Sequence, residues 1–147
     1  MALESGVITK WDPMTVIHLP VGTEALYAGD LCSFESSAVV LFNAVGNNTT
    51  FCGVTFAKKD SDVATGTYIP LATKCILSVP LTSAAYFLGQ GLKYDGTTRN
   101  QLVDHGASAA DTIAWYHDEP ATTTRANVLI DIVQLVMVAG IYETPVV

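Results

Sequence analysis

Regular punctuation by turn-forming residues constrains the fold of this chain more than any other sequence feature. Short runs rich in β-branched and aromatic residues are separated, about every ten residues, by segments containing Gly, Pro, Asn or Asp. Apolar residues rarely recur at the three-to-four spacing of a helix. The pattern therefore predicts an all-β fold, a small closed or nearly closed β-barrel with at most one short helix.

Local signals place the expected strands and turns. Gly53 inside a strand indicates a bulge or a close backbone approach, and Asp95-Gly96 indicates a hairpin turn. Pro70 and Pro80 should occupy strand edges or ends, because proline lacks the N–H that a sheet interior requires. One short helix is expected over residues 82–89. The expected strands lie within residues 14–19, 31–35, 38–45, 50–57, 67–81, 91–103, 112–117 and 126–138.

The length and composition indicate one folded domain. The chain has 147 residues, of which 50% are hydrophobic and 14% charged, and this is ample for a packed core. We expect residues 1–20 to form an N-terminal arm and first strand. Residues 21–147 would form the β domain with a C-terminal extension, in which residues 133–147 are apolar enough to be buried at a subunit interface.

The charge balance argues against direct binding to nucleic acid. Fourteen acidic and seven basic residues give a net charge of -7. A nucleic-acid binder needs a cluster of Lys and Arg to neutralise phosphates, and the basic residues here are scattered along the sequence. No apolar stretch reaches the length of a signal peptide at the N-terminus or of a membrane span elsewhere. The sequence thus predicts neither a nucleic-acid nor a membrane partner.

The cysteines and histidines give little support for chemistry. Cys32, Cys52 and Cys75 each lie among apolar residues and without a Cys-x-x-Cys motif, which favours buried reduced thiols and, weakly, a reducing compartment. His117 beside Asp118 and Glu119 is the best candidate for metal ligands or an acid–base pair. Adjacent strand residues point to opposite faces, however, and no second cluster accompanies them. We expect no metal, no cofactor and no enzymatic activity.

One segment is similar to an enzyme motif. Residues 27–33, YAGDLCS, resemble the first motif of trimeric all-β dUTPases. The Arg-Ser-Gly motif and the Gly-rich C-terminal arm of that family are missing, so Asp30 is interpreted as a turn residue before a strand. A small β-fold enzyme remains the third class of function.

The order of features from Gly29 to Ile132 resembles that of tailed-phage capsid decoration, or cement, proteins, which have a fold called a β-tulip. AGDLCSF is similar to a Gly-Asp strand entry of that family, and FCGVTFAKKD is similar to a strand followed by a polar turn. GTYIPLATKCILSVPL resembles the family's central pair of strands. LGQGLKYDGTTRNQL and TIAWYHDEPATTTRANVLIDI are similar to its two later hairpins. Trp115 departs from the family pattern, in which small residues are usual, and the chain extends past the expected end.

The resemblance implies a virion structural protein of a bacteriophage. Such a protein binds the outer surface of the major capsid protein shell, stabilises the head and is assembled in the host cytoplasm, here as a homotrimer. Residues before about Leu19 would contact the shell, with Trp11 and Met14 as candidate anchors, although Trp11 packing on its own barrel is an equal alternative.

A second class of function is a receptor- or glycan-binding β module of a phage fibre or tail. Aromatic side chains that stack on sugars would then be exposed, and the candidates are Tyr86, Phe87, Trp115 and Tyr116. The alternative is that these side chains fill the core.

Overall fold

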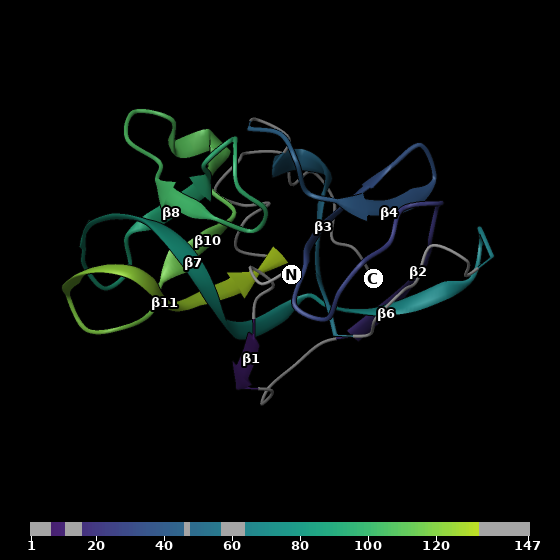
Figure 1. The fold of residues 1–147 in the computed structure, drawn as a ribbon, viewed down its shortest axis with the longest axis horizontal. Helices are drawn as coiled ribbons and strands as arrows, with labels where there is room; N and C mark the ends of the chain where they lie inside the picture. The colour runs from purple at the N-terminus through teal and green to yellow at the C-terminus, as the bar shows by residue number, and fades with distance from the viewer. Residues whose placement is uncertain (1–6, 11–15, 46–47, 57–63, 133–147) are drawn as a thin grey trace.

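The computed structural model describes residues 7–10, 16–45, 48–56 and 64–132. These residues form two sheets that lie side by side, joined where β6 leads into β7 (Figure 1). The helical elements of the described ranges are two three-residue 3-10 turns, η1 (Asn48–Thr50) and η2 (Ala109–Asp111). The all-β fold class expected from the sequence is confirmed.

The first sheet is a closed N-terminal barrel of five strands. Its strand order is β2-β6-β5-β3-β4, and every pair is antiparallel. A parallel bridge between Val21 and Val39 joins the two ends of this order, so the sheet closes on itself. The strands are β2 (Val16–Pro20), β3 (Leu31–Glu35), β4 (Ala38–Leu41), β5 (Phe51–Thr55) and β6 (Tyr68–Ala72).

The second, C-terminal sheet has six strands in the order β1-β7-β11-β10-β8-β9. Here too a parallel contact, between Leu81 and Leu102, joins β7 to β9 and closes a ring of five strands. Strand β1 is the sixth and lies outside that ring, on the edge of β7. The strands are β1 (Val7–Lys10), β7 (Lys74–Tyr86), β8 (Gly91–Tyr94), β9 (Leu102–Asp104), β10 (Ala114–Tyr116) and β11 (Ala121–Asp131).

Two hydrophobic clusters follow from the alternation of side chains along the strands. The smaller one fills the N-terminal barrel and includes Val21, Leu26, Cys32 and Leu71. The larger one fills the C-terminal sheet and continues to the outer face of the barrel, from which it takes the side chains of Leu31, Phe42, Phe51, Val54 and Ala72. Because residues such as Leu31 and Cys32 point to opposite faces, one strand serves both clusters. The two sheets therefore share a core.

At Gly53 the backbone of β5 lies very close to the backbone of β6. Its φ is +131°, and a Cβ placed there would lie 2.5 Å from the carbonyl oxygen of Ala72. The pairing of β3 with β5 shifts register at the same point, between Cys32 and Ser33. The expectation of a bulge or close approach at Gly53 is thus confirmed.

Other local expectations are confirmed in part. Residues 91–103 form the predicted β8–β9 antiparallel hairpin, with Asp95-Gly96 in the connection. Pro70 and Pro80 lie inside strands, but each is paired on one side only. Pairing of β6 with β5 begins after Pro70, and Pro80 lies between the contacts that β7 makes with β1 and with β9. Both prolines therefore occupy local edges, as their missing N–H requires.

Two expectations about residues 82–89 and 118–125 are wrong. The expected short helix is the outer end of β7, which continues to Tyr86 and pairs with β11. The expected connection through 118–125 is shorter, because Ala121 to Arg125 already belong to β11. The outer ends of β7 and β11 pair with each other in one long antiparallel ladder. This strand pairing outweighs the weak helix-capping signal in the sequence.

The expected boundary between residues 1–20 and 21–147 stays a prediction. Within the first range the structure describes two strands, β1 and β2, which belong to different sheets. Trp11, Met14 and the apolar tail 133–147 lie outside the described residues.

Candidate functional site

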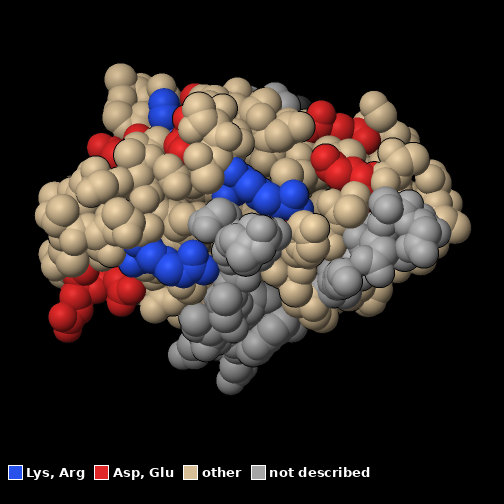
Figure 2. All heavy atoms as spheres, in the orientation of Figure 1, with Lys and Arg blue, Asp and Glu red and all other residues tan. Residues whose placement is uncertain are grey.

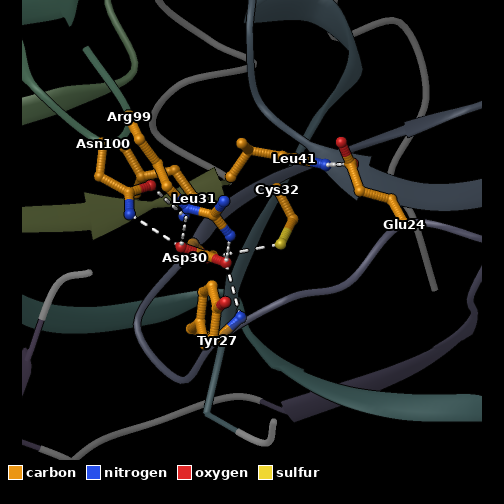
Figure 3. A network of polar contacts seen from close by, with 8 residues as sticks. All are labelled: Glu24, Tyr27, Asp30, Leu31, Cys32, Leu41, Arg99 and Asn100. Atoms are coloured by element: carbon orange, nitrogen blue, oxygen red, sulfur yellow. Dashed lines mark hydrogen bonds and ion pairs between the residues drawn. The ribbon is translucent and has the colours of Figure 1, made fainter. Parts of the chain in front are cut away.

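Asp30 is the centre of a polar network that reaches across the two sheets (Figure 3). It follows a turn in which Tyr27 N–H donates to its carboxylate at 2.7 Å, and its side chain is fully buried. Arg99 and Asn100, which come from the β8–β9 connection of the other sheet, donate to the same carboxylate. Asn100 also accepts the Leu31 N–H at 2.9 Å. The network thus joins the two sheets.

The loop around Asp95 holds the donors in place. The Asp95 carboxylate accepts the N–H groups of Thr97 and Thr98, at 2.9 and 3.0 Å, and an N–H of the Gln101 side chain at 2.8 Å. Asn100 has a φ of +61°, a left-handed conformation that asparagine adopts more readily than most residues. The short side-chain-capped turn therefore presents Arg99 and Asn100 toward Asp30.

Four hydrogen-bond donors surround the Asp30 carboxylate. One oxygen accepts the Tyr27 N–H and an Arg99 terminal nitrogen, while the other accepts Arg99 Nε at 3.1 Å and Asn100 Nδ2 at 2.8 Å. Four donors fill the roughly four lone-pair sites of a carboxylate. The hydrogen bond from Arg99 to Asp30 also raises the pKa of the guanidinium. We conclude that Asp30 is a clamp between the sheets.

Asp30 is a turn residue directly before β3, as expected from the sequence, and its ion pair with Arg99 adds a second role. The sequence gives no direct signal for the clamp, because its partner Arg99 is 69 residues away. Arg99 also lies over the ring of Tyr27, with its Cζ 4.9 Å from the ring centroid. The YAGD segment therefore combines a turn with a buried ion pair.

The most exposed apolar side chains of the C-terminal sheet lie at its β7–β8 turn. Phe87 and Leu88 are 59% and 63% exposed. Beside them is an open groove of about 380 Å³, whose lining includes Leu88, Trp115, His117 and Leu129. This end of the sheet is a surface on which another molecule can pack, although nothing in the structure identifies that molecule.

The four aromatic residues considered for sugar stacking divide into two groups. Tyr86 and Tyr116 are buried and stack on each other, with ring centroids 5.5 Å apart, and burial raises the pKa of both hydroxyls. For these two residues, the alternative that they fill the core is confirmed. Phe87 is exposed and Trp115 is half-buried at the groove.

A wider, polar groove of about 510 Å³ lies on the N-terminal barrel. Its lining includes Glu24, Glu35, Asn43 and Thr65. Each glutamate already accepts one hydrogen bond at 2.7 Å, Glu24 from the Leu41 N–H and Glu35 from the Ser33 hydroxyl. These bonds stabilise the ends of β3 and β4 and fix one carboxylate oxygen of each residue.

The three histidines are divided between the two sheets. His18 is exposed on β2 and His117 is exposed after β10, whereas half-buried His105 follows β9 and covers Gly91. Asp118 accepts the Asn127 N–H at 3.1 Å, so it links the segment after β10 to the middle of β11. Within the described ranges, no three His, Cys, Asp or Glu side chains are grouped as metal ligands would be.

The three cysteines are free thiols. Cys32 and Cys75 are buried, as expected, and Cys52 is half-buried. Burial raises the pKa of Cys52 and of Cys75 to about 12, and raises that of Cys32 well above its usual value. At neutral pH these thiols are therefore protonated and poor nucleophiles.

The candidate capsid-contact residues Trp11 and Met14 lie outside the described residues, so their role stays a prediction. In the described part of the chain, no helix has the length and apolar character to cross a membrane. The sequence matches no protein-family model and no curated protein.

Proposed function

We propose that this chain is a non-enzymatic structural protein of a bacteriophage virion. In this proposal it is a capsid decoration protein that binds the outer surface of the major capsid protein shell as a homotrimer and stabilises the head. The proposal starts from the order of strands and turns between Gly29 and Ile132, which resembles that of decoration proteins. It assigns no substrate and no cofactor to the chain.

The single observation that carries the proposal is the doubly closed body. Both sheets close through a parallel contact, and a shared core and a buried ion pair join them. Closure pairs strand edges that would otherwise promote aggregation, and β1 is the described strand that lies outside a closed ring. Such a closed fold suits a protein that acts by binding to and covering a shell that is under mechanical load.

The charge distribution supports the same proposal. On the face drawn in Figure 2, Lys and Arg side chains lie in small separate groups, and the chain as a whole carries a net charge of -7. An acidic surface disfavours adhesion to the nucleic acid that a head contains.

A receptor- or glycan-binding module is the second candidate, and one observation favours it. An exposed aromatic ring beside a groove with a half-buried indole is an arrangement on which a sugar ring can stack. Phe87 and Trp115 provide these two groups.

The test mixes the purified full-length protein with empty heads, before and after expansion, and measures its copy number in sedimented particles. A copy number near that of the major capsid protein supports decoration. A few copies per particle support the fibre or tail alternative, and failure to bind either head overturns the decoration proposal. Trp11→Ala should weaken head binding, whereas Phe87→Ala, the matched control, should leave it unchanged and weaken binding only if a glycan is the ligand.

A further inference from the structure

Strand β1 occupies an unusual position in the fold. The other five strands of the C-terminal sheet form a closed ring, and β1 is added to the outer edge of β7. It pairs antiparallel with β7 at three positions, Val7 with Ser78, Ile8 with Leu77 and Lys10 with Ile76. The ring does not need β1 in order to close, so the Ile76–Ser78 edge of β7 is a separate strand-binding site.

A long stretch of chain links β1 to its partner strand β7. All five strands of the N-terminal barrel lie between β1 and β7 in the sequence, so no hairpin turn links them. Residues 11–15, which include Pro13, separate β1 from β2, and β2 belongs to the other sheet. The pairing therefore depends on the main-chain hydrogen bonds of the β1–β7 ladder.

The same contacts are available to the β1 of a second copy. Exchange of an identical element between copies preserves every contact, so the balance depends on effective concentration and on the hinge. An edge left without β1 would expose unpaired N–H and C=O groups, which favours filling it by either route.

We propose that β1 is exchanged between copies, so that residues 7–10 of one chain pair with the Ile76–Ser78 edge of β7 in its neighbour. The partner is a second copy of this chain, and the exchanged strands hold the oligomer together. The proposal concerns self-assembly and does not rest on the capsid role, because exchange can occur with or without head binding.

Cysteine cross-linking in the full-length chain tests the exchange. Val7 and Ser78 are directly opposite in the register. Opposite residues of antiparallel strands have Cα atoms about 4.5–5.5 Å apart, which suits a disulfide. Val7→Cys and Ser78→Cys chains are prepared separately, unfolded, mixed, refolded together and oxidised with copper phenanthroline. We expect a heterodimer whose disulfide, mapped by mass spectrometry, links positions 7 and 78.

Two controls make the result decisive. Ile8→Cys replaces Val7→Cys in a matched mixture and should give no link to position 78, because adjacent strand residues point to opposite faces. The unaltered chain, treated identically, accounts for the three native thiols. The chain carrying both Val7→Cys and Ser78→Cys should form covalent oligomers. If that chain closes into internally linked monomers, or forms no 7–78 link at all, the exchange proposal is overturned.

Discussion

The N-terminal barrel and the C-terminal sheet close in the same way but differ in how they obtain a core. The barrel encloses a small cluster that includes Cys32 and Leu71, whereas the larger cluster fills the C-terminal sheet and extends over the outer face of the barrel. Part of the barrel wall is therefore covered by hydrophobic side chains on both its inner and its outer face. This difference indicates that the C-terminal sheet stabilises the barrel, and that the two unfold together.

Core truncation should give the largest effect and test this dependence most directly. Leu77→Ala removes a fully buried side chain from the shared cluster and should lower the free energy of unfolding by about 4 kcal/mol. Leu71→Ala, in the smaller cluster with half-buried neighbours that can relax, should cost about 3 kcal/mol. Urea unfolding followed by tryptophan fluorescence and by circular dichroism should give coincident transitions for both variants. Separate transitions would contradict the shared-core interpretation.

Breaking the clamp should give the next largest effect. Asp30→Ala leaves the partly buried guanidinium of Arg99 without its partner and should cost about 3 kcal/mol in unfolding free energy. Glu119→Ala, which removes an exposed carboxylate, should change it by less than about 0.5 kcal/mol. Equal urea midpoints for the two variants would mean that the ion pair does not stabilise the junction.

The two most crowded glycines sharpen the comparison between the regions. Gly53→Ala places a Cβ against backbone at a positive φ and should cost about 2–3 kcal/mol. Gly91→Ala in the C-terminal sheet meets the half-buried ring of His105, which can rotate away, so we expect a loss of about 1 kcal/mol. Thermal unfolding measured side by side gives the order, and the reverse order would contradict this account.

Thiol titration should give the smallest effect and is visible only in alkali. Burial raises the pKa of Cys52 and Cys75 from the usual value of 9.0 to about 12. Above pH 9 the unfolded chain therefore loses protons before the folded chain, and the free energy of unfolding falls as pH rises toward 12. Below pH 9 these thiols make no contribution to the pH dependence.

Alanine variants separate the two regions in this titration. The urea midpoint of each variant is measured at pH 7 and at pH 10.5. Replacing both Cys32 and Cys52 with Ala should reduce the fall in this midpoint by more than Cys75→Ala does. Tyrosines that also titrate in alkali are common to all variants, so the difference reports the thiols. Unchanged slopes in both variants would contradict the assignment.

Local features of the fold could be predicted from the sequence, and long-range ones could not. The run 31–35 forms a strand with the expected bounds and Gly53 makes the expected close approach, because each depends on nearby backbone geometry. Asp95-Gly96 lies between β8 and β9 as expected, but it begins a connection of residues 95–101 and is not a tight hairpin turn by itself. The division into two sheets depends on which strands meet, such as β7 with β11, and turn spacing carries no such information. For the same reason the clamp between Asp30 and Arg99 was not predictable, and the outer end of β7 was interpreted as a helix.

The order of the strands along the chain has a consequence for biosynthesis. Every strand of the N-terminal barrel precedes β7, so all five are synthesised before the strands that complete the shared core. Strand β1 is made first, yet its acceptor β7 emerges only after the whole barrel has been synthesised. During that interval β1 has no β7 edge to pair with in its own growing chain. A neighbouring chain whose β7 has already been synthesised then has an opportunity to bind it.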